Sequence, residues 1–153
     1  MKEVDVKQTI AWIGEIDCSL EAFHRLNERY RLIWVTQEEM PADPSTIENP
    51  LPEVEVVNCA KEGCWEADII ILAGVIHQEL LEKIREVSTQ KIVMIITADE
   101  KVKMFSLISE VLPFSKVVEI TLSSAEVRFS GENPGAVATA NDIVELLGYQ
   151  ISM

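Results

Sequence analysis

The chain alternates between short, continuously apolar runs and longer segments whose apolar residues recur at helical spacing. The apolar runs predict buried strands, because a strand covered on both faces is apolar at every position. Strands are expected at 9–14, 30–36, 54–58, 67–74, 91–96, 116–121 and 125–129. Helices are expected at 19–29, 60–66, 77–87, 98–111 and 134–147.

Strands that alternate with amphipathic helices predict an α/β fold with a mostly parallel sheet and right-handed crossovers. We expect a Rossmann-like, doubly wound sheet of about 7–8 strands with an antiparallel edge, in a single domain over residues 1–153. Residues 149–153 are the candidate eighth strand. In this fold the ligand crevice lies at the carboxyl ends of the strands, here between the strands at 9–14 and 67–74.

One connection differs from the rest in composition. Four of the six prolines fall within residues 38–53. Proline removes backbone donors and disfavours helix in the residue before it, so this segment is predicted to be an extended surface loop. Its length is unusual for an α/β connection.

Charge and cysteine content exclude several classes of function. The formal net charge of −13 over 153 residues argues against binding to nucleic acid or to an anionic membrane. No apolar run reaches the roughly 18 residues of a membrane span, and no secretory signal is recognisable, so a cytoplasmic protein is expected. Cys18, Cys59 and Cys64 match no disulfide or zinc spacing, so we expect reduced thiols and no metal site.

The turn after the first strand is only partly typical of a dinucleotide-binding loop. That loop has the pattern G-x-G-x-x-G, which needs three small residues. Here Gly14 fills the first position, but Ile16 stands at the second and Ser19 at the third.

Three stretches carry a resemblance to a known family: residues 10–14 (IAWIG), 67–73 (ADIIILA) and 129–149, which include FSGENPGA and LGY. Together they resemble the N-terminal domain of NADP oxidoreductases that use a deazaflavin coenzyme. Pyrroline-5-carboxylate reductases and 6-phosphogluconate dehydrogenases are relatives of that family. The resemblance implies that NADP or NAD binds at the crevice. The cofactor-binding positions it implies are Gly14, Glu15, Ile16, Ser19, Thr36, Gln37, Ala73 and Gly74.

The chain also departs from that family. Ile16 adds a branched side chain where the pyrophosphate approaches the backbone, and Glu15 and Asp17 add negative charge to the same loop. After the second strand, Thr36 and Gln37 could hydrogen-bond a ribose phosphate. A glutamate at 38 or 39 could instead accept from ribose hydroxyls, which is the NAD arrangement.

Few residues suggest catalytic chemistry. His77 follows the strand at 67–74, so it is the candidate acid or base near the crevice, although a solvated helix terminus explains it equally well. His24 is expected on the surface of its helix. Ser19 and Thr97 are expected first as helix caps. The tryptophans Trp12, Trp34 and Trp65 are expected to fill the core, with a self-associating surface as the alternative.

Two interpretations of function stand. In the first, the chain is an oxidoreductase-like Rossmann protein that binds NAD(P) at a remodelled loop. In the second, it is a non-catalytic Rossmann scaffold that has lost the dinucleotide and serves as a dimerisation, interaction or small-ligand module, for example in a homodimer. The relatives complete their substrate site with a C-terminal segment. That half is expected to be absent here, supplied by another chain, or not needed.

Overall fold

The computed structural model describes residues 8–14, 20–35, 55–57, 60–73, 78–97, 105–122 and 127–147, and within them it forms an α/β fold around one sheet. The sheet has the order β3-β2-β1-β4-β5-β6-β7. Strands β1 to β6 are parallel, and β7 pairs antiparallel with β6. This is the Rossmann order with one added edge strand, so the predicted fold class is confirmed. The strands are β1 (Thr9–Gly14), β2 (Arg31–Val35), β3 (Glu55–Val57), β4 (Ile69–Ala73), β5 (Ile92–Thr97), β6 (Lys116–Leu122) and β7 (Val127–Gly131).

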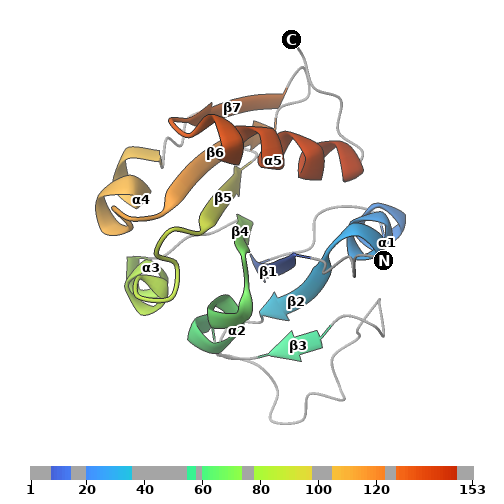
Figure 1. Cartoon of the computed structure of the whole chain (residues 1–153), viewed down its shortest axis with the longest axis horizontal. Helices are drawn as coiled ribbons and strands as arrows, with labels where there is room; N and C mark the ends of the chain where they lie inside the picture. The colour runs from blue at the N-terminus through green and yellow to red at the C-terminus, as the bar shows by residue number, and fades with distance from the viewer. Residues whose placement is uncertain are drawn as a thin grey trace, which may run out of the picture.

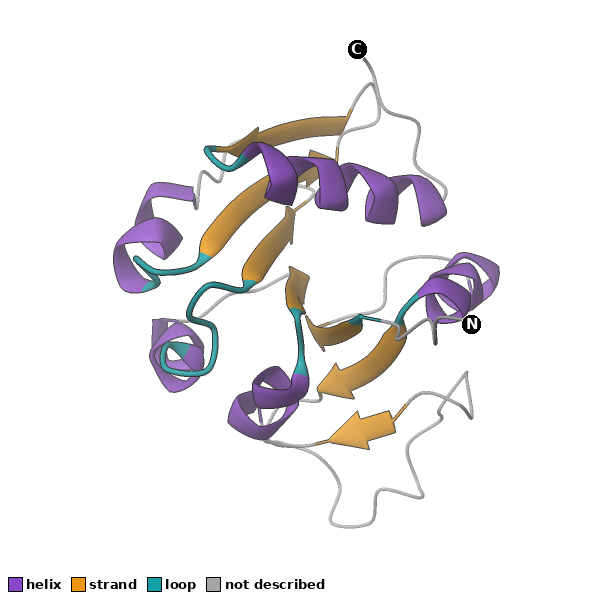
Figure 2. Cartoon of the chain, in the orientation of Figure 1, coloured by secondary structure: helices purple, strands orange, loops and turns teal. Residues whose placement is uncertain are grey.

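In the part of the chain that the structure describes, five helices cover the two faces of this sheet. They are α1 (Leu20–Arg29), α2 (Ala60–Glu66), α3 (Gln78–Ile84), α4 (Phe105–Val111) and α5 (Pro134–Leu146). Helices α1 and α5 lie on one face, and α2, α3 and α4 lie on the other (Figure 1). Figure 2 shows the strands as a twisted layer between these two groups. Each face has its own apolar core, as a doubly wound sheet requires.

Strand β4 is the centre of both cores. All five of its residues are buried, and Ile69, Ile70 and Ile71 have no exposed surface. Successive side chains point to opposite faces, so a strand that packs against helices on both sides must be apolar throughout. This explains why the run at 67–74 was the clearest strand signal in the sequence.

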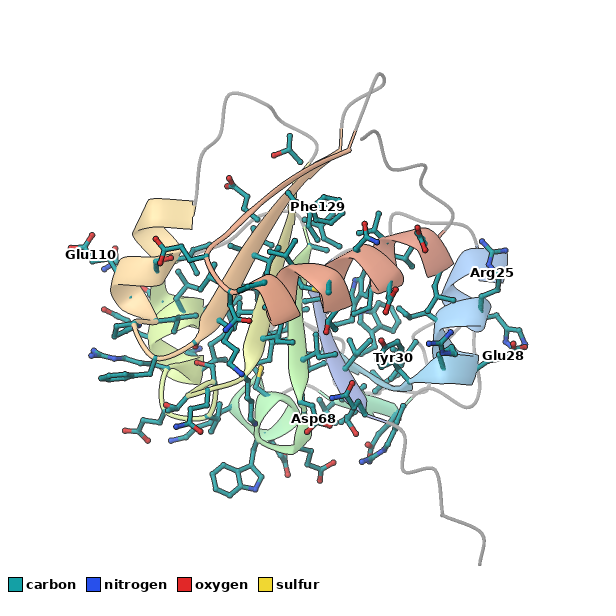
Figure 3. All side chains as sticks on the ribbon, turned by 45° about the horizontal axis from the view of Figure 1, so that its top comes forward. Arg25, Glu28, Tyr30, Asp68, Glu110 and Phe129 are labelled. Atoms are coloured by element: carbon teal, nitrogen blue, oxygen red, sulfur yellow. The ribbon has the colours of Figure 1, made fainter. Side chains whose placement is uncertain are left out.

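Asp68 ties together the amino ends of three strands. Its carboxylate Oδ2 accepts from the backbone N–H of Thr9 at 2.9 Å, and its own N–H donates to the Thr9 carbonyl at 2.8 Å. Its carbonyl accepts from the N–H of Ile92 at 3.4 Å. Figure 3 shows Asp68 at the end of the sheet where these strands begin. Asp68, the aspartate of the ADIIILA stretch, therefore has a structural role at the end of the sheet opposite the one where the crevice is expected.

We predict that Asp68→Ala lowers the free energy of unfolding by about 1–2 kcal/mol, because the N–H of Thr9 loses a charged acceptor in a partly buried place. Asp68→Asn keeps a carbonyl oxygen and should recover about half of the loss. Urea unfolding of the three proteins measures both effects. Equal stability of wild type and alanine variant would show that the hydrogen bond is not needed.

Lys91 links helix α2 to the start of β5. Its Nζ donates to the carbonyls of Cys64 at 2.6 Å and of Trp65 at 2.9 Å, which satisfies acceptors at the helix C-terminus. Burial lowers the pKa of the Lys91 ammonium, and the nearby Cys64 and Asp68 raise it in opposition. The end of the sheet where the parallel strands begin, called the amino edge below, is thus held by specific polar contacts.

Helix α5 follows the predicted start signal. Asn133 is its N-cap, with Oδ1 accepting from the N–H of Ala136 at 2.9 Å, and Pro134 stands at the first helical position. At the other end, Arg25 of α1 donates from Nε to the Leu146 carbonyl at 3.1 Å. Arg25 thus caps a neighbouring helix (Figure 3).

Several boundaries and one packing expectation differ from the structure. Strand β7 runs over Val127–Gly131, not 125–129, and Thr97 is the last residue of β5. Trp12 and Trp34 lie opposite each other in register. As expected, both pack in the core on the face that α1 and α5 cover, which is called the α1–α5 core below. Trp65 does not fill the core, because 72% of it is exposed. The proline-rich loop at 38–53 and the candidate strand at 149–153 lie outside the described residues.

Of the helices in the described part of the chain, none combines the length and the apolar character that crossing a bilayer demands. The longest of them, α5, has 13 residues. A transmembrane helix needs about 20 apolar residues.

Candidate functional site

The carboxyl ends of β1 and β4 lie side by side. Gly14, the last residue of β1, is opposite Ala73, the last residue of β4. From β1 the chain proceeds to β2 and β3 on one side, and from β4 it proceeds to β5 and β6 on the other. Because these connections diverge, a crevice forms at this point in doubly wound folds. The predicted position of the crevice, between the first and fourth strands, agrees with the observed strand order.

Both residues at the mouth of this crevice are small. Gly14 has no side chain, and Ala73 has a methyl group that packs in the α1–α5 core with 8% of the residue exposed. Small residues here let a ligand approach the strand ends closely. Helix α1 is described from Leu20, and in a strand–turn–helix unit the helix N-terminus lies beside the end of the strand. Such an end attracts anions, so this place suits a phosphate chemically.

The structure places only two of the nine candidate site residues. Gly14 and Ala73 are brought together at the strand ends. The others lie outside the described residues, and their roles stay predictions: Glu15, Ile16, Ser19, Thr36, Gln37, Gly74 and His77.

Three other titratable side chains lie away from the crevice. His24 is exposed on α1, with Nε2 at 3.5 Å from Oε1 of Glu28. Burial and the nearby Asp142 raise the pKa of the Tyr30 hydroxyl, which lies between α1 and α5 (Figure 3). Cys64 is buried and forms no disulfide. No three His, Cys, Asp or Glu side chains converge to hold a metal within the described ranges.

Two buried polar residues on β6 were missed by sequence reasoning. Glu119 is 3% exposed and Thr121 is 7% exposed. The signal for them was polar residues at alternate positions within the run KVVEITL, a pattern that predicts a strand but does not show which of its faces is buried. Alternation places both on the same face of the sheet.

Comparison with known proteins relates the chain to solved structures only. No protein-family model matches it, and no curated protein matches it significantly. The solved structure of pyrroline carboxylate reductase from Plasmodium falciparum with NADP bound matches 93% of this chain and 56% of its own length, at 13% identity and a TM-score of 0.63. The imine reductase from Myxococcus stipitatus in complex with NADP+ matches 94% of this chain and 54% of its own, at 12% identity and a TM-score of 0.68.

A third match has a more similar length. A hypothetical protein from Sinorhizobium meliloti, SMa0349, matches 95% of this chain and 83% of its own, at 21% identity and a TM-score of 0.64. The chain spans about half the length of the two reductases. These identities show the fold alone: it is a Rossmann fold, as the predicted resemblance implied. Pyrroline-carboxylate reductase, a relative of the family that the sequence resembles, is among the structural neighbours.

Proposed function

We propose that this chain is an oxidoreductase-type Rossmann protein that binds NAD or NADP at the crevice between β1 and β4. The observation that carries the proposal is the pairing of Gly14 with Ala73 where the strand order reverses. Two small residues at this point let the pyrophosphate of a dinucleotide approach the backbone. The NADP-bound reductases with the same fold support it.

The two halves of the sheet would share the ligand. In a doubly wound sheet, β1 to β3 form one mononucleotide-binding half and β4 to β6 the other, and the dinucleotide lies across the crevice between them. The nicotinamide ring would supply the hydride chemistry, while the protein binds and orients it. Gly14 would provide the tight turn at the pyrophosphate, and His77 is the candidate acid or base. The substrate and the direction of the reaction stay open.

The loop after Gly14 should weaken phosphate binding. Glu15 and Asp17 bring two negative charges, and a carboxylate near a helix N-terminus already satisfies the dipole that would attract phosphate. A phosphate and a carboxylate about 5 Å apart repel each other by on the order of 1–3 kcal/mol near a surface. That corresponds to roughly 5- to 150-fold in affinity. We therefore expect a weaker interaction than an intact glycine motif would give.

The same residues favour a second candidate function. Ile16, Glu15 and Asp17 lack what a dinucleotide needs and would repel one, which suits a non-catalytic scaffold that has lost the cofactor. Such a scaffold would act as a dimerisation, interaction or small-ligand module. A homodimer would appear in analytical ultracentrifugation as a species of twice the 17.2 kDa chain mass.

Nucleotide titration separates the two functions. We predict that the double variant Ile16→Gly, Asp17→Ala binds NADH or NADPH roughly 10- to 100-fold more tightly than the wild type, as measured by calorimetry and thermal shift. Glu28→Ala, an exposed substitution on α1, is the control that changes net charge by one without touching the loop. A deazaflavin arm tests the coenzyme that the resemblance implies. If neither protein responds to millimolar nucleotide, the scaffold function stands and the cofactor proposal is wrong.

A further inference from the structure

Buried polar residues in the described part of the chain fall into two groups. Thr9 and Ser88 are at the amino edge, where their contacts are structural. The N–H of Thr9 donates to Asp68, and Ser88 Oγ donates to the Arg85 carbonyl at 3.1 Å. Glu119 and Thr121 form the other group, and they lie together on β6 in the half of the sheet that leads to the crevice. The first group is explained by the fold, whereas the second is not.

The register of the sheet fixes the position of Glu119 along the strand direction, relative to the strand ends at Gly14 and Ala73. It lies in the row directly below the one that contains Gly14 and Ala73. That row reads Ile13, Leu72, Ile95 and Glu119 across β1, β4, β5 and β6. Thr121 lies two residues further along β6, opposite Thr97 at the end of β5. The layer beneath the crevice is therefore apolar from β1 to β5 and becomes polar at β6.

Stability alone does not explain a carboxylate in this layer. Moving an ionised carboxylate out of water costs several kcal/mol, and apolar replacements of buried charged groups are often neutral or stabilising. Glu119 is engaged in an interaction, and no buried side-chain oxygen or nitrogen of the described residues is without a partner. Glu119 is thus held in place, so its effect on a ligand would pass through the groups it contacts.

We propose that Glu119, together with Thr121, is a positioning residue for the nicotinamide half of a bound dinucleotide. This inference rests on the proposed function. Strands β4, β5 and β6 lie side by side and form the second mononucleotide-binding half, which receives the nicotinamide end (Figure 1). Thr121 stands near the end of β6 and Glu119 two residues before it, so these two fixed polar groups would lie beneath what binds at the strand ends. The ADP end would lie over β1 to β3, away from β6.

Two ligands that share the ADP half, only one of which carries nicotinamide, test whether Glu119 acts on the nicotinamide half. NADH and ADP-ribose share the ADP half, and only NADH carries nicotinamide. In Glu119→Gln we expect the Kd for NADH to rise about five- to tenfold, while the Kd for ADP-ribose changes less than about twofold. Calorimetry measures both. Glu110→Gln is the matched control, because Glu110 is exposed on the outer side of α4 (Figure 3) and should leave both constants unchanged.

Each outcome decides one of the proposals. A selective loss of NADH affinity supports the inference, because a purely structural role would move both ligands together. Equal changes, or none, would overturn it and leave the proposed function intact. If wild type binds neither ligand, both proposals are wrong. Should Glu119→Gln fail to fold, Thr121→Val provides the same comparison, with a selective NADH loss again expected.

Discussion

Ile71→Ala is expected to lower the free energy of unfolding by about 3–4 kcal/mol. Ile71 has no exposed surface, and it stands in β4 between Trp12 of β1 and Met94 of β5 in register. All three belong to the α1–α5 core. Removing its side chain leaves a cavity that paired strands on both sides cannot close.

Urea unfolding followed by circular dichroism measures this loss. Ile71→Val removes one methyl group, so it should cost only about 1 kcal/mol. The ratio between the two variants tests whether the cost follows the volume removed. A loss below about 1 kcal/mol for the alanine variant would show that the core relaxes around the site and closes the expected cavity.

Gly63→Ala is the second large effect, and it goes against helix propensity. Alanine normally stabilises a helix interior by about 1 kcal/mol relative to glycine. A Cβ at Gly63 would lie only 2.6 Å from Cγ2 of Val35 and 3.1 Å from Cγ2 of Val57. Val35 is buried and β-branched, so it has little freedom to move. We expect a net loss of about 1–2 kcal/mol, because overpacking costs more than the propensity gains.

A double-mutant cycle isolates the cause. Val35→Ala removes the methyl group that collides with the new Cβ, so Gly63→Ala should become neutral or stabilising in that background. The coupling between the two substitutions should exceed about 1 kcal/mol. If Gly63→Ala stabilises the otherwise unchanged chain, the close approach of α2 to the sheet is not rigid.

Features set by local sequence could be predicted. The continuous apolar run of β4 and the Asn133–Pro134 start of α5 both appear in the structure, because burial on two faces and helix capping leave direct marks on sequence. Boundaries were less accurate. Strand β7 lies two residues later than expected, since alternation is preserved by a shift of two and pairing with β6 decides the register.

The candidate site, too, could be predicted from the sequence only in part. The Gly14–Ala73 pair follows from a rule of the fold, so sequence could place it. The buried Glu119 was not found, because alternation in KVVEITL shows which residues share a face, but burial of that face depends on the pairing of β6 with β5 and β7. Trp65 was misplaced for a related reason: an aromatic residue in a short helix gives no sign of which side faces the sheet. Most of the expected contact residues fall outside the described ranges.

The tryptophans give the chain an internal fluorescent probe. Trp12 lies two residues before Gly14 and opposite Trp34, whereas Trp65 stands at the amino edge with its indole in solvent. Reduced nicotinamide absorbs where tryptophan emits, so a nucleotide in the crevice would accept energy from the first two indoles more readily than from the third. A dissolved quencher would reach Trp65 first. Trp65→Phe would therefore leave a protein whose emission reports on events at the crevice.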